Sequence, residues 1–132
     1  MHFVVVFDAC VLYPAPLRDF LLRLATTGLF AARWTERIQD EWSRSLLRER
    51  PGLADAIAVT RRKMEAAIPD CLVTDYESLI NGLKLPDPDD RHVLAAAIRC
   101  GAQLIVTNNL KDFPSDCLSG FGIEAIPPDN FV

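Results

Sequence analysis

The chain has 132 residues, of which half are hydrophobic, with a net charge of −4 at pH 7 and a pI near 5.1. This length and apolar content predict a single domain over residues 1–132, with a hydrophobic core. The acidic balance argues against a protein that holds nucleic acid by bulk charge. It does not exclude a nuclease, because bound cations would reverse the local field.

The four cysteines are scattered without a CxxC pair, and two histidines accompany them. This pattern argues against a disulfide scaffold or a zinc site and predicts small buried side chains in a reducing cytosol. No apolar run approaches a membrane span, and Met1 to Phe7 is too short and lacks the basic flank of a signal peptide. We therefore expect a soluble, cytoplasmic protein without membrane association.

The first unit of the chain is a predicted strand and helix. Phe3 to Phe7 is a continuous β-branched and aromatic run, typical of a buried parallel strand, and it ends at Asp8. Asp8 is a candidate metal ligand, although an isolated Asp after a strand is also common in turns. Apolar residues at helical spacing then predict a helix that Gly28 ends: Leu17, Phe20, Leu21 and Leu24.

A second unit is predicted from Leu29 to Trp34 as a short strand, followed by a helix from Glu36 to about Arg50 with Thr35 as its N-cap. The core-facing stripe of this helix consists of Ile38, Trp42 and Leu46.

The same helix carries a row of basic residues close to Glu41, which lies near the edge of the apolar stripe. Arg37, Arg44 and Arg48 project within about 40° of one another on an ideal helix. Such a row could contact phosphate groups. The alternative is a solvated face in which Glu41 pairs with Arg37 or Arg44.

Three further segments give weaker patterns. Leu53 to Ile68 is a predicted helix with a basic triplet at Arg61 to Lys63, of a kind that is usually solvated. Cys71 to Thr74 is predicted to be extended, and Glu77 to Leu83 to be a short helix.

The most informative stretch runs from Pro86 to Pro114. Asp87, Asp89 and Asp90 precede an apolar helix that Gly101 ends, and Asp89 is the expected N-cap. Gln103 to Thr107 follows as a predicted central strand of a parallel sheet. The chain then enters a turn containing Asp112, and the predicted edge strand is Gly122 to Ile126.

Alternating strands and helices predict an α/β fold with a doubly wound parallel sheet. The loops after its strands would then bring Asp8, Asp90 and the turn from Asn109 to Asp112 together. Carboxylates at such close range repel one another unless they hold a cation. Oxygen ligands favour Mg²⁺ or Mn²⁺ as that cation. Such a site suits hydrolysis of phosphodiester bonds.

Four sequence blocks together resemble the PIN-domain family, especially the bacterial VapC-like ribonuclease toxins: FDACVLYPAPLRD, IQDEW, LPDPDDRHVLAAAI and VTNNLKDFP. The resemblance covers nearly the whole chain, and the last two blocks are its most specific part. It implies a three-layer αβα sandwich with a mostly parallel sheet, RNA cleavage that depends on Mg²⁺ or Mn²⁺, and a cognate antitoxin in a type II toxin–antitoxin pair. We also expect a homodimer.

Carried over by position, the resemblance implies three principal acidic residues: Asp8, Glu41 and Asp90. The family's fourth acidic position, in a T-x-D pattern that starts at Thr107, is occupied here by Asn109. An amide brings no charge, so Asp112 is the candidate for the missing carboxylate. If Asp112 does not supply it, the chain is a PIN-fold binding or regulatory module with weakened catalysis.

Four other positions bear on the candidate site. Cys10 stands where the family commonly has Asn, and we expect it to loosen the surroundings of Asp8. A haloacid dehalogenase phosphatase needs a second Asp at this same position, so that class is set aside. His92 is interpreted as a packed residue at the edge of the site, the alternative being contact with a phosphate or with Asp90. Asp87 and Asp89 are interpreted as turn and cap residues.

Overall fold

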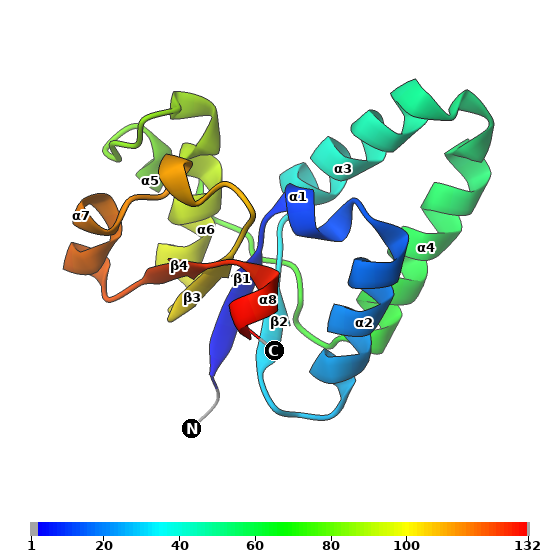
Figure 1. Cartoon of the computed structure of the whole chain (residues 1–132), viewed down its shortest axis with the longest axis horizontal. Coiled ribbons are helices and arrows are strands. Elements are labelled where there is room, and N and C mark those ends of the chain that lie inside the picture. Colours follow the sequence, from blue (N-terminus) through cyan, green and yellow to red (C-terminus); the bar gives the residue numbers. More distant parts are fainter. Residues whose placement is uncertain (1–2, 132) are drawn as a thin grey trace.

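A parallel β-sheet forms the centre of the molecule in the computed structural model, which describes residues 3–131 (Figure 1). Its strands are β1 (Val4–Phe7), β2 (Ala31–Arg33), β3 (Leu104–Val106) and β4 (Glu124–Ile126). They lie in the order β2-β1-β3-β4, and every neighbouring pair is parallel. The predicted α/β class and parallel sheet are confirmed, with β3 in a central position and β4 at an edge.

Helices on both sides of the sheet complete the three layers of the sandwich. The α-helices are α1 (Ala9–Leu12), α2 (Ala15–Thr26), α3 (Glu36–Glu49), α4 (Ala54–Ala67), α5 (Glu77–Ile80), α6 (Arg91–Cys100), α7 (Ser115–Leu118) and α8 (Pro128–Phe131). Short 3₁₀ turns are η1 (Pro51–Leu53), η2 (Pro88–Asp90), η3 (Leu110–Asp112) and η4 (Ser119–Phe121). Helix α6 packs against β1 and β3, whereas α2 packs against β2. Figure 1 shows α3 and α4 side by side as a hairpin beyond the β2 edge.

Helix α3 has the start and the buried stripe that its sequence predicts. The Thr35 hydroxyl accepts a hydrogen bond from the Ile38 N–H at 3.0 Å, which confirms the N-cap. Ile38 and Trp42 are buried, and Leu46 is partly buried against the same core. This packing fixes the face of α3 on which Glu41 lies.

A buried arginine ties α1 to α3. The Arg18 guanidinium lies 4.6 Å from the centre of the Trp42 ring, and its Nη1 donates to the Leu12 carbonyl at 2.8 Å. A cation over an aromatic face is attracted by the ring quadrupole, which here holds the end of α1 against α3. The two elements that carry Asp8 and Glu41 are therefore braced together.

Several predicted boundaries are wrong by one to three residues. The strand expected from Leu29 to Trp34 is β2 alone, and Trp34 forms a separate parallel bridge to Leu72. Strand β4 is shorter than Gly122 to Ile126, because Gly122 is in the left-handed region with φ 71° and so belongs to the preceding turn.

The predicted cap of α6 is also wrong. Asp89 lies within η2, and its N–H is accepted by the Asp87 carboxylate at 2.9 Å. Asp87 therefore caps the 3₁₀ turn η2, and the N-cap of α6 is Asp90, whose side chain makes no capping hydrogen bond. The helix ends as predicted at Gly101, with φ 70° in the left-handed region that glycine tolerates.

The cysteines are free, but only Cys71 is fully buried; Cys10, Cys100 and Cys117 are partly exposed, contrary to the expectation of buried side chains. Within residues 3–131, no helix combines the length and the apolar character needed to cross a membrane.

Candidate active site

Asp8 lies at the carboxyl end of β1, where the sheet places it against β3. Phe7 pairs with Val106, so the next residues, Asp8 and Thr107, are neighbours. The Thr107 hydroxyl donates to Asp8 Oδ2 at 2.8 Å, and the Ala9 N–H donates to Oδ1 at 2.8 Å. Burial raises the pKa of Asp8, these hydrogen bonds lower it in part, and the nearby Glu41 charge raises it further.

Cys10 contacts Asp8, whereas the sequence led us to expect a loosened environment. Its Sγ lies 3.5 Å from both Asp8 Oδ2 and Thr107 Oγ1, and the Asn108 N–H donates to the sulfur at 3.4 Å. Burial, followed by the Asp8 charge, raises the pKa of Cys10 to about 11. The thiol therefore stays protonated at neutral pH and acts as a weak donor to Asp8.

Glu41 contacts His92 rather than an arginine. His92 Nε2 lies 3.1 Å from Glu41 Oε2, and the His92 side chain is fully buried while that of Glu41 is 36% exposed. The interpretation of His92 as a packed residue at the edge of the site agrees with its burial. The alternative of a contact with a phosphate or with Asp90 is not what the structure shows, because the ring nitrogen meets Glu41. The predicted pairing of Glu41 with Arg44 is likewise wrong, since Arg44 lies 4.0 Å from Asp40.

Asp90 is the point at which the acidic residues converge. Burial, followed by the charges of four other carboxylates, raises its pKa to about 6; these carboxylates are Asp8, Asp87, Asp112 and Glu41. Like charges have this effect only at short range. The four candidate residues predicted from the sequence therefore share one neighbourhood, and Asp87 joins them.

The turn after β3 contributes one buried and two more accessible groups. Thr107 is fully buried and its hydroxyl accepts the Asn109 N–H at 3.0 Å. Asn109 is exposed, whereas Asp112 at the end of η3 is half-buried. Of these two side chains, Asp112 is the one whose charge acts on Asp90.

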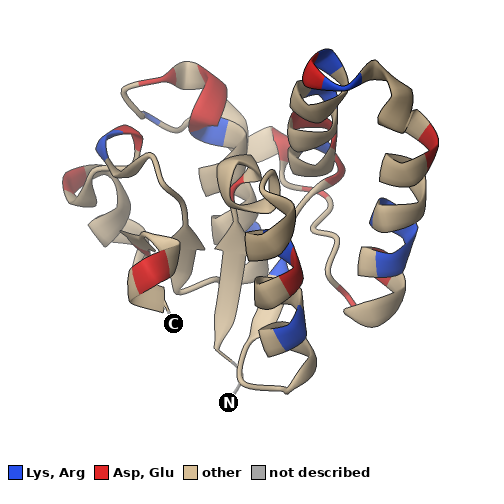
Figure 2. Cartoon of the chain, turned by 45° about the vertical axis from the view of Figure 1, so that its right-hand side comes forward, with Lys and Arg blue, Asp and Glu red and all other residues tan. Residues whose placement is uncertain are grey.

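The basic residues near the site differ in their surroundings. Arg37, Arg44 and Arg48 are exposed on α3, and Arg48 lines a cavity that also includes Glu41. Arg61 of the basic triplet instead pairs with Glu36 and Asp40, at 3.1 and 2.9 Å. Figure 2 shows basic and acidic residues interspersed along α3 and α4. Arg48 is therefore the arginine of the predicted row with the most direct access to the site.

The donor set is suited to a hard divalent cation. Carboxylate, amide and hydroxyl oxygens are the ligands of Mg²⁺ and Mn²⁺, and the repulsion around Asp90 is what a bound cation would offset. Across residues 3–131, no three Asp, Glu, His or Cys side chains are grouped closely enough to hold one ion. The residues thus fit Mg²⁺ bound in its usual way, through one or two carboxylates and several waters.

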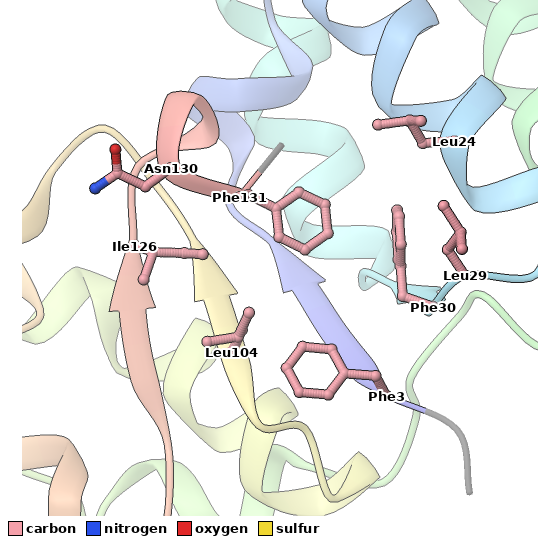
Figure 3. A pocket seen from close by; sticks show the side chains of 8 residues that line it. All are labelled: Phe3, Leu24, Leu29, Phe30, Leu104, Ile126, Asn130 and Phe131. Atoms are coloured by element: carbon pink, nitrogen blue, oxygen red, sulfur yellow. The ribbon is translucent and has the colours of Figure 1, made fainter.

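A separate apolar hollow of about 390 Å³ lies on the sheet face covered by α2 and α8 (Figure 3). Phe30 and Phe131 line it from two sides, with ring centroids 4.8 Å apart, and Asn130 is its polar residue. Its lining contains no charged side chain. This hollow is therefore not suited to a phosphate or a metal ion.

Sequence reasoning missed two residues beside the site, Tyr13 and Glu49. The Tyr13 hydroxyl donates to Glu49 Oε2 across 36 residues of sequence. Glu49 lies eight residues beyond Glu41 on α3, about 80° further around an ideal helix, so helical spacing alone does not show that both carboxylates border one cavity.

Fold and site together define an α/β protein with an acidic centre at the carboxyl edge of a parallel sheet. The family model of the PIN domain matches residues 4–111, and the chain belongs to this family. A stretch of 43 residues is 58% identical to "Putative ribonuclease VapC50" of Mycobacterium tuberculosis. That stretch covers 33% of this chain and 25% of the relative.

Proposed function

We propose that this protein is a ribonuclease that hydrolyses RNA phosphodiester bonds with the help of Mg²⁺ or Mn²⁺. The observation that carries the proposal is the convergence on Asp90 of the charges of Asp8, Glu41 and Asp112, in a chain of the PIN-domain family. Carboxylates that gather without a cation repel one another, and function is a common reason for retaining such a cluster. The similarity to a ribonuclease over part of the chain supports the same activity.

In this proposal each residue has a distinct task. Asp8 and Asp90 would hold the cation, with Asp112 adding charge on the side away from Glu41. Bound there, the cation would lower the pKa of water and offset charge on the transferring phosphate. Glu41, held by His92 at 3.1 Å, would orient the attacking water and accept its proton. Arg48 would bind a phosphate of the RNA strand.

The test is cleavage of a random-sequence single-stranded RNA pool by the purified protein in Mn²⁺, Mg²⁺ or EDTA. We expect cleavage with either cation, none in EDTA, and a loss of at least about a hundredfold in Asp8→Asn, because one carboxylate then fails to hold the cation. Equal cleavage by wild type and Asp8→Asn would contradict the site. A wild type that binds RNA but does not cut it would favour the binding-module alternative.

A paired substitution tests which residue supplies the fourth charge. Asp112→Asn should lower kcat about tenfold or more, whereas Asn109→Ala should have a smaller effect, since only the former removes charge near Asp90. The matched change on the same turn makes each variant the control for the other. Equal and negligible effects would remove the turn after β3 from the mechanism.

We further propose that the chain is the toxin of a type II toxin–antitoxin pair, supported by its similarity to VapC50. Expression in a bacterium should then arrest growth, and Asp8→Asn should not. The cognate antitoxin and the homodimer remain predictions. Co-purification with the product of an adjacent gene and the mass of the purified protein in solution would test them.

A further inference from the structure

A second cavity lies directly beside the acidic centre, between α1 and α3. Its volume is about 510 Å³, within the roughly 300–1,000 Å³ typical of ligand sites. Cys10 and Glu41 belong to its lining, and Cys10 also contacts Asp8. A group bound in this cavity would therefore adjoin whatever is bound at Asp8 and Asp90.

The walls of this α1–α3 cavity combine an aromatic ring, a carboxylate and a guanidinium. Tyr13 lies at the end of α1 and donates its hydroxyl to Glu49 Oε2 on α3. That hydrogen bond raises the pKa of Tyr13, so the phenol remains a donor at neutral pH. Arg48 Nη2 lies 3.3 Å from the Ser45 hydroxyl, and its guanidinium is exposed. Both residues line the same cavity as Tyr13 and Glu49.

We propose that the α1–α3 cavity binds the nucleotide next to the scissile phosphate, and that Glu49 makes it prefer a base with an exocyclic amino group over uracil. This inference rests on the proposed ribonuclease activity and adds a substrate preference to it. In this arrangement the base stacks on Tyr13, the amino group donates to Glu49, and Arg48 contacts the adjoining phosphate.

The preference follows from the hydrogen-bonding chemistry of a carboxylate. An ionised Glu only accepts hydrogen bonds, and Tyr13 occupies one of its two oxygens, which leaves Oε1 for the ligand. Adenine, cytosine and guanine each carry an amino group that can donate to it. Uracil presents carbonyl oxygens on both sides of its single ring N–H donor, and these would repel the carboxylate. One hydrogen bond to a charged group corresponds to a discrimination of about tenfold.

The experiment sequences the new ends made when the protein cuts a random-sequence single-stranded RNA pool in Mn²⁺. For the wild type, we expect uracil to be depleted about tenfold at one position adjoining the cut. Glu49→Gln replaces the acceptor by a side chain that both donates and accepts, so depletion should fall to about twofold or less. Tyr13→Phe keeps the aromatic ring but removes the hydrogen bond that holds Glu49, so uracil depletion should become weaker without disappearing.

Glu124→Gln is the matched control, because it is the same neutralisation at an exposed position on β4. Its end pattern should equal that of the wild type. Cut ends without uracil depletion, or an identical depletion in wild type and Glu49→Gln, would overturn the subsite while leaving the nuclease intact. No cleavage by the wild type would contradict the proposed function itself, and this subsite with it.

Discussion

Asp90 shows how a single residue in this site opposes folding. Its ordinary pKa of 3.8 is raised to about 6 by burial and neighbouring carboxylates, so its ionisation is less favourable in the folded chain than in the unfolded one. The unfavourable contribution is absent below pH 3.8, grows as the pH rises, and is complete above pH 6. At neutral pH the apo protein therefore carries the full effect.

Asp90→Asn should stabilise the metal-free protein at pH 7.5. After a discount for solvent screening of this partly exposed group, we expect about 1 kcal/mol, or about 3–5 °C in Tm. The gain should shrink as the pH falls from 6 towards 4. Thermal unfolding in EDTA at several pH values measures it. A Tm that decreases in Asp90→Asn at pH 7.5 would contradict the repulsion, and Asp116→Asn, an exposed Asp on α7, is the control.

The places of the candidate acidic residues in the fold were predictable from the sequence, but their hydrogen-bond partners were not. Asp8 follows a run that reads as a buried strand, and Asp90 precedes an apolar helix, so both were placed correctly at the edge of the sheet. The His92 contact with Glu41 joins residues 51 positions apart, and no local pattern encodes it. The same holds for Tyr13 and Glu49. Side-chain pairs between elements depend on packing, which periodicity does not report.

At the scale of elements, the His92–Glu41 contact joins α6 to α3 across the site. The buried ring presents Nε2 to the carboxylate, while Nδ1 has no hydrogen-bond partner among the described residues. This arrangement favours the tautomer with its proton on Nε2, because the unpaired Nδ1 is then a buried acceptor without a partner and not a buried donor without one. His92 is thus a positioning residue for Glu41.

We expect His92→Ala to lower kcat about tenfold with little change in KM, because Glu41 loses its orientation rather than its charge. His92→Gln should recover much of the loss, since its amide can donate to the same oxygen. If His92 had only a structural role, both variants would lose stability without the selective loss of kcat over KM. The kinetics are therefore measured well below the Tm of each variant. In the background of Glu41→Gln, His92→Ala should cost little more. Independent, additive losses would contradict the coupling.

Element types were predicted more reliably than element ends. Thr35 and Gly101 acted as the start and stop signals they appeared to be, because a cap and a left-handed glycine are local features. Strands were predicted too long, because a residue belongs to a ladder only where a partner strand runs beside it. Leu29 and Gly122 adjoin the residues of β2 and β4 in the sequence, but both lie outside the hydrogen-bonded ladders.

For the whole molecule, the proposed ribonuclease function raises the question of how an acidic protein would hold RNA. The single-domain expectation for residues 1–132 stays a prediction, to be checked by whether unfolding is one transition. On α3, Arg48 lines the α1–α3 cavity, whereas Arg44 lies 4.0 Å from Asp40. We therefore expect Arg48 to supply a phosphate contact that Arg44 supplies less well.

The salt dependence of RNA binding distinguishes the two arginines. On an Asp8→Asn background, Arg48→Ala should flatten the log–log salt slope by about 0.7, the contribution of one neutralised phosphate on a single strand. Arg44→Ala, the matched control, should change it less. An unchanged slope when both are replaced would move the phosphate contacts elsewhere, with Arg62 and Lys63 on α4 as the next positions to test.

The link between Asp8 and Thr107 has a consequence for synthesis of the chain. These residues are 99 positions apart, so β1 acquires β3 as its neighbour only after Leu104–Val106 has been translated. A nascent polypeptide therefore cannot assemble the acidic centre until β3 and Thr107 have emerged from the ribosome. The proposed activity would begin only after that point, so shorter nascent chains would not cleave the message that encodes them.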